Sequence, residues 1–225
     1  MTISADLLDA AAKLDALLER AERLDSRMAI LNEAASVSDV ASGYESDLGD
    51  LVQSLLRGGH RLSKGAFRRD MRKAVKDWAK QMFNVAWEEG GGDIDETEAD
   101  DLALLEDFTS EQQGYVSDFA DWLTAKESDL DAVPDRLSLW AASLENFGGQ
   151  IKARAMGDPS LTFDGDDGEE SCDECQEWKG QTHRLSFWEK RGLTKRNGNE
   201  NFGCKRFDNC HHSFFHTKTG EIVIP

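Results

Sequence analysis

All four cysteines of this chain lie in its last quarter, arranged as two pairs. Cys172 and Cys175 are separated by two residues, and Cys204 and Cys210 follow after an insert of 28 residues. A CxxC turn presents two thiolates that can occupy adjacent corners of a tetrahedron, and structural zinc takes four Cys or His ligands. The pattern therefore predicts a structural Zn²⁺ bound by Cys172, Cys175, Cys204 and Cys210.

Three histidines follow the second cysteine pair, so the identity of the fourth zinc ligand stays open. His211 and His212 follow Cys210 directly, and His216 lies four residues further on. An imidazole nitrogen is an ordinary zinc ligand. His212 is therefore an alternative to Cys204 or Cys210.

Two other chemistries fit the same residues less well. A redox CxxC motif usually begins a helix after a strand of a larger α/β pattern, and that context is missing around Cys172. A catalytic zinc keeps one position open for water and needs a base beside it. Four cysteines would close the ligand shell, so we interpret the site as structural.

Most of the chain before the cysteines, up to residue 147, has apolar residues at helical spacing. Leucines and alanines recur at heptad spacing from Leu7 to Leu31, which predicts a helix over 4–31 that packs on the body or serves in self-association. A polar Ser/Asp/Gly stretch at 36–46 precedes further helical patterns that continue to residue 147. Glycine runs such as 58–59 and 90–92 end these helices.

The composition changes at Leu161. LTFDG and the final EIVIP are short strand candidates, and turns, aromatic residues and all four cysteines lie between them. We therefore expect a mainly α protein, a helical bundle of about five to six helices with a small zinc-stapled α/β module at its C-terminus. The expected divisions are a heptad helix at 1–36, a helical body at 37–157 and the cysteine-rich module at 158–225.

The net charge of −18 is concentrated in the first 171 residues, which carry −20, whereas the remainder carries +2. Such an acidic body repels nucleic acid over most of its surface. The basic helix at 64–80 is the exception, with six cations on its outer positions. They either neutralise acidic neighbours, which we favour, or meet an anionic partner. No aromatic residue is interleaved among them, so base stacking is not supported.

The chain has no apolar run long enough to span a bilayer and no secretory signal at its N-terminus. We therefore expect no membrane partner, and a protein that stays in the cytoplasm where it is made.

The stretch CDECQEWKGQTHRLSFWEKRGL, followed by NFGCKRFDNCHH, resembles the C-terminal region of tailed-phage head morphogenesis or minor head proteins. In that family a CxxC turn is followed by a Gly, a Trp, a Gly-Leu turn and a final cysteine cluster. The matching positions here are Cys172, Cys175, Gly180, Trp188, Gly192, Leu193, Cys204 and Cys210. The family's last two cysteines are often one residue apart, where this chain has Cys210 and His212.

The resemblance extends more loosely upstream and covers roughly residues 44–216. It implies a minor capsid protein of the phage head, assembled in the host cytoplasm with the portal and major capsid proteins and carried in the virion. It transfers no catalytic residues. The expected function is therefore structural, through protein–protein contacts in head morphogenesis and viral assembly.

Two alternatives stay open. The first is a zinc-stapled nuclease of the HNH or treble-clef kind, using His211 or His212 as a base, although His183 and the asparagines at 197, 199 and 201 lack a recognisable ligand spacing. The second is a phage-encoded adaptor that acts on the host and is absent from particles.

Overall fold

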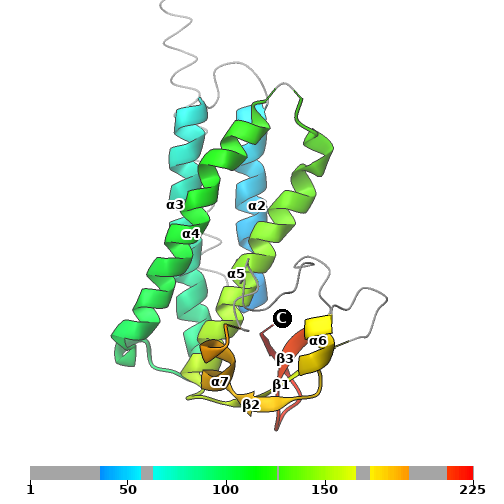
Figure 1. The fold of residues 1–225 in the computed structure, drawn as a ribbon. Coiled ribbons are helices and arrows are strands. Elements are labelled where there is room, and N and C mark those ends of the chain that lie inside the picture. The colour runs from blue at the N-terminus through cyan, green and yellow to red at the C-terminus, as the bar shows by residue number, and fades with distance from the viewer. Residues whose placement is uncertain (1–35, 57–62, 126, 166–172, 193–211, 225) are drawn as a thin grey trace, which may run out of the picture.

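The computed structural model describes residues 36–56, 63–125, 127–165, 173–192 and 212–224 (Figure 1). The predicted heptad helix at 4–31 lies outside these residues. So do three of the predicted zinc ligands, Cys172, Cys204 and Cys210.

Four long helices form the body. They are α2 (Val37–Leu56), α3 (Lys64–Glu89), α4 (Ala99–Leu123) and α5 (Val133–Ala155), and the 3₁₀ turns η1 (Ile94–Glu96) and η2 (Leu130–Ala132) lead into α4 and α5. Figure 1 shows the four running side by side along one long axis. Helices α2, α3 and α5 pack against one another, and α4 lies along α3. The mainly helical prediction is confirmed.

Local sequence signals fix where these helices begin. The hydroxyl of Ser63 caps α3 by accepting from the backbone N–H of Ala66 at 3.2 Å. Glu98 and Asp101 form a reciprocal capping box at the start of α4. Pro134 lies in the first turn of α5, where its missing N–H costs nothing.

The polar stretch at 36–46 is helical, contrary to the expectation that it precedes the helix. Its serines and aspartates disfavour a helix locally. However, Val40, Ala41 and Tyr44 recur at helical spacing and are buried at 0–6% exposure. Burial of this stripe against α3 and α5 outweighs the local preference, so α2 begins at Val37.

The core of the body lies where the helices cross. Trp78 of α3 is fully buried and donates its indole N–H to the Asp47 carboxylate of α2 at 2.9 Å. Phe108 of α4 stacks on Phe147 of α5, with ring centroids 4.4 Å apart. At Gly148 of α5 an added Cβ would collide with the Met82 thioether of α3, so the glycine permits the close approach of these two helices.

The C-terminal module is a four-stranded antiparallel sheet with two short helices. The strand order is β2 (Thr182–Arg184), β1 (Ser160–Gly165), β3 (His212–His216) and β4 (Ile222–Ile224). The two helices are α6 (Asp173–Trp178), between β1 and β2 in the sequence, and α7 (Leu185–Lys190), directly after β2. The strands predicted around LTFDG and EIVIP are β1 and β4, and both predictions are confirmed.

The module packs against the C-terminal half of α5. Ala153 of α5 belongs to the same apolar cluster as Leu161, Phe163, Trp188 and Ile224 of the module. Trp188 is fully buried and donates its indole N–H to the carbonyl of Leu161 at 3.2 Å. The division at residue 158 stays a prediction, and the two cores meet at α5.

No helix within the described ranges combines the length and the apolarity that crossing a membrane requires.

Candidate functional site

Two of the predicted zinc ligands, Cys175 and His212, lie in described parts of the module. Cys175 is on α6, and its side chain is buried at 1% exposure. His212 is the first residue of β3 and is also buried at 1% exposure. A thiol and an imidazole are the donor types that zinc prefers. The buried placement of both fits the predicted ligand set.

The sheet and its apolar core position these two side chains. His212 is paired with Gly165 across the β1–β3 ladder, and its ring stacks on Phe163 with centroids 5.3 Å apart. Phe163 and Cys175 belong to one cluster of buried side chains. Both candidate ligands therefore border the same core, approached from β3 and from α6.

Within the described residues, no group of three or more His, Cys, Asp or Glu side chains gathers as a metal site would require. Cys172, Cys204 and Cys210 fall outside those residues, so the four-cysteine set stays a prediction. The same holds for His212 as an alternative ligand.

The remaining described histidines contact protein groups. The ring of His183 stacks on Phe187 with centroids 3.8 Å apart, and its Nε2 lies 3.1 Å from the Gln181 side-chain oxygen. Nδ1 of His216 lies 3.1 Å from the Thr219 hydroxyl. These contacts orient both rings as parts of the module's structure.

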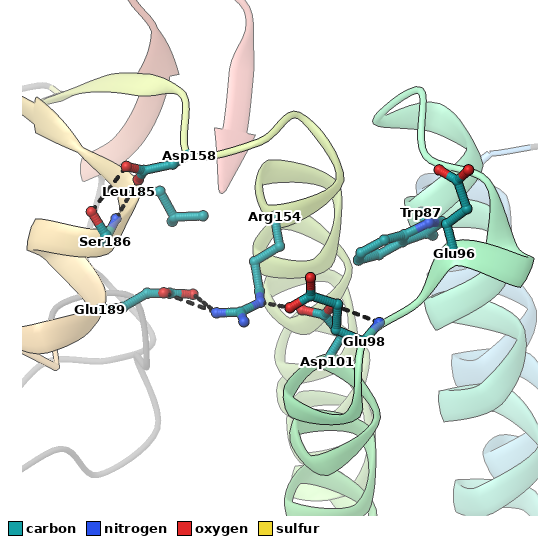
Figure 2. A pocket seen from close by; sticks show the side chains of 9 residues that line it. All are labelled: Trp87, Glu96, Glu98, Asp101, Arg154, Asp158, Leu185, Ser186 and Glu189. Carbon is teal, nitrogen blue, oxygen red and sulfur yellow. Dashed lines mark hydrogen bonds and ion pairs between the residues drawn. The ribbon is translucent and has the colours of Figure 1, made fainter.

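A separate hollow of about 450 Å³ lies where the body meets the module (Figure 2). It is formed by the C-terminal end of α3, by η1 and the start of α4, by the end of α5 with the turn that follows it, and by α7. Its lining is Trp87, Glu96, Glu98, Asp101, Arg154, Asp158, Leu185, Ser186 and Glu189.

Arg154 occupies the centre of this hollow and joins three helices. Its Nε donates to Asp101 of α4 at 2.6 Å, and its Nη1 contacts both carboxylate oxygens of Glu189 of α7 at 2.8 and 2.9 Å. Figure 2 shows the guanidinium between these two carboxylates. Partial burial acts to lower the pKa of Arg154, but hydrogen bonds and charge interactions with the two carboxylates outweigh it and raise the pKa above its ordinary value.

Other polar groups in the hollow also satisfy one another. Asp158 has a left-handed backbone with φ of 58°, and its carboxylate accepts from the Ser186 N–H at 2.7 Å and from the Ser186 hydroxyl at 3.0 Å. The second oxygen of Asp101 accepts from the Glu98 N–H at 3.3 Å. We therefore interpret the hollow as a structural joint between body and module.

The sequence offered no signal for this joint. Arg154 lies in the last turn of α5, where a basic residue is common because it complements the helix dipole. Its partners Asp101 and Glu189 lie 53 and 35 residues away. Only the tertiary structure brings them together.

Fold and site together define a class of architecture: a four-helix body whose last helix carries a small mixed α/β module, fixed by a partly buried ion network. No protein-family model matches the chain, and neither the curated proteins nor the solved structures contain a significant match. The resemblance to phage head proteins therefore rests on the sequence alone, above all on residues 172–193 and 201–212.

Proposed function

We propose that this protein is a minor structural component of a tailed-phage head, acting through protein–protein contacts with the portal and major capsid proteins. The observation that carries the proposal is the fixed attachment of the cysteine-bearing module to the helical body. The cation of Arg154 is bonded to carboxylates on both sides of the junction. A fixed orientation of body and module is what we expect of a structural protein that contacts the portal and major capsid proteins at the same time.

The choice of particle comes from the sequence resemblance of residues 172–193 and 201–212 to minor head proteins, which extends more loosely over 44–216. The described part of the resemblance has structural roles in the module. Cys175 and Trp188 are buried in its core. Gly180 has a positive φ of 75° and turns the chain from α6 into β2.

Exposed apolar side chains offer material for contacts. In the described regions, several large apolar residues are 41–55% exposed, and aromatic residues such as tyrosine are enriched at protein interfaces. These residues are Leu102, Tyr115, Leu130, Leu139 and Ile222.

We also infer that the module binds one structural Zn²⁺ through Cys172, Cys175, Cys204 and Cys210, with His212 as the alternative to one of the last two. When bound, the metal would crosslink segments of a module whose apolar core is small. The burial of Cys175 and His212 beside the same core supports this inference. The ion would rigidify the tail and would leave no open coordination position.

Quantitative mass spectrometry of purified phage particles tests the proposed function, comparing DNA-filled heads with empty precursors. We expect the protein in filled heads at a fixed, low copy number relative to the major capsid protein. Presence only in precursors would identify an assembly factor that leaves before maturation. Absence from both would contradict the proposal and favour the nuclease or the adaptor, which magnesium-dependent nicking of plasmid DNA separates.

A further inference from the structure

Charge is strongly segregated among the helices of the body. Helix α3 carries seven Lys and Arg against four Asp and Glu. Helix α4 carries seven Asp and Glu and no cation, and α2 carries four and no cation. Helix α3 packs against both acidic helices. Its cations can therefore neutralise carboxylates within the body or bind an anionic partner outside it.

Three of the seven cations of α3 serve the body. Lys64 and Arg68 both pair with Asp121 of α4, and Arg72 donates to the Ser117 hydroxyl at 3.0 Å. Neutralisation of acidic neighbours therefore accounts for this side of the helix.

The other four cations form a separate line on the outer face of α3, which we call the basic stripe. Arg69, Lys73, Lys76 and Lys80 are spaced four, three and four residues apart and are all exposed. At 1.5 Å per residue the stripe extends about 16 Å along one face. Lys73 pairs with Asp77 of its own helix at 2.6 Å, whereas no ion pair within the described residues accounts for the other three.

Helix α4 has a complementary line, the acidic stripe, made by Asp107, Glu111 and Asp118. All three are exposed and are spaced four and seven residues apart, so they also share one helical face. Tyr115 lies beside them at 49% exposure, with its hydroxyl 3.4 Å from the Glu111 carboxylate. Tyrosine is enriched at protein–protein interfaces.

The spacings of the two stripes coincide. Lys80, Lys76 and Arg69 are separated by four and seven residues, as are Asp107, Glu111 and Asp118. In an antiparallel alignment each cation meets one carboxylate, and Lys73 lies opposite Gly114, which has no side chain to obstruct it. Antiparallel alignment also places the helix dipoles favourably.

We propose that the basic stripe of one copy of this chain binds the acidic stripe of a second copy. The two stripes face outward on neighbouring helices and remain exposed within a single copy. The pairing is therefore intermolecular, and because it joins two different patches it can continue into a ring or a row of copies.

The width of the basic stripe favours this partner over double-stranded DNA. Packed helices lie about 8–10 Å apart, and a duplex presents two phosphate strands across grooves of about 6 and 12 Å. The second phosphate strand would therefore lie over α2 or α4, which carry carboxylates and no cations. A single acidic helix covers the stripe without that repulsion.

Sedimentation velocity of the full chain over a concentration series, in 20 mM and in 500 mM NaCl, tests the proposal. Exposed ion pairs are individually weak and are screened by salt. We therefore expect the weight-average sedimentation coefficient to rise with concentration at low salt and to stay at the monomer value at high salt.

Charge reversal makes the test specific. Lys76→Glu/Lys80→Glu and Asp107→Lys/Glu111→Lys should each abolish association, whereas an equimolar mixture of the two should restore it, because the reversed stripes complement each other. The control variant is Lys190→Glu/Lys218→Glu, which changes two exposed lysines of the module and has the same net charge as Lys76→Glu/Lys80→Glu. It should associate like the wild type. Far-UV circular dichroism confirms that each variant retains its helices.

Three results would overturn the proposal. The first is a wild type that stays monomeric at low salt over the whole concentration series. The second is an equimolar mixture of the two stripe variants that fails to associate. The third is a Lys190→Glu/Lys218→Glu control that loses association as fully as the stripe variants. In the first case, binding of a 20-bp DNA duplex by the monomeric wild type and its loss in Lys76→Glu/Lys80→Glu would identify the basic stripe as a nucleic-acid surface instead.

Discussion

Arg154 shows how much of this molecule's organisation depends on one side chain. It is the shared partner of Asp101, whose side chain is 7% exposed, and of Glu189, whose side chain is 27% exposed. A partly buried carboxylate that loses its cation keeps its desolvation cost without the compensating attraction. The joint therefore contributes to stability mainly by keeping Asp101 satisfied.

We predict that Arg154→Met lowers the free energy of unfolding by about 2 kcal/mol, because Asp101 is left buried without its cation. Urea denaturation followed by circular dichroism measures the change. The matched control is Lys152→Met on the same helix, which breaks a single ion pair with Glu89 and should cost below about 1 kcal/mol. Equal losses in the two variants would contradict the special role of Arg154.

Asp121 gives a pH-dependent prediction at the same scale. A hydrogen bond from Lys64, reinforced by Arg68, lowers the pKa of Asp121 below its ordinary value of 3.8. A carboxylate with a lowered folded-state pKa stabilises the fold above its unfolded pKa, and this contribution is lost as the pH falls through the folded value. Asp121→Asn should therefore be less stable than the wild type at pH 6, with the difference shrinking below pH 4.

Unfolding curves of both proteins across that pH range measure the effect. A difference between them that stays constant down to the acid limit would show that the Asn substitution acts through packing instead of charge.

At the scale of the elements, packing at one helix crossing is set by a residue without a side chain. Gly148 of α5 lies against Met82 of α3 and Val37 of α2, and a Cβ there would collide with the first. Gly114 of α4 has nothing within 4 Å of a built Cβ. The same substitution should therefore have opposite effects at these two helical positions.

We predict that Gly148→Ala destabilises the protein by about 1–2 kcal/mol, because the strain of overpacking exceeds the gain in helix propensity. Gly114→Ala should stabilise it by about 0.5–1 kcal/mol, because only the propensity changes. Thermal and urea unfolding of both variants measure the pair. A stabilised Gly148→Ala would show that Met82 moves aside without cost.

The elements also show what the sequence could predict. Ser63 and the glycines at 90–92 mark the two ends of α3, and Pro134 marks the start of α5. The expected end at residue 147 was wrong, because α5 continues through Gly148 and Gly149 to Ala155. Gly148 is buried where α5 packs closely on α3, so tertiary packing outweighs the low helix propensity of glycine there.

The start of α2 has a local signal that the sequence reading missed, because the Ser36 hydroxyl accepts from the backbone N–H of Asp39 at 3.1 Å, as an N-cap does. Burial of Val40 and Tyr44 against other helices adds to it. Short apolar runs predicted strands β1 and β4. Strand β2 has only three residues and lies at the edge of the described sheet, next to β1, so the sequence carries no clear signal for it.

At the scale of the whole molecule, one candidate site could be predicted from local sequence patterns and the other could not. Cysteine spacing is a local signal, and it singled out Cys175 and, with the nearby histidines, His212, both of which are buried in the module. The Arg154 network is built from α4, α5 and α7 and has no local signature. Sequence reasoning therefore proposed metal ligands of which two are buried in the module, and it missed the joint that fixes the module to the body.

One structural Zn²⁺ bound by the cysteines is the proposal on which the organisation of the module depends. Native mass spectrometry of the full chain, purified with zinc present and then dialysed, tests this proposal. We predict one zinc per wild-type chain and none in Cys172→Ser/Cys175→Ser, whose body helices should persist by circular dichroism. A wild type without zinc, or full zinc retention in the double variant, would contradict the claim.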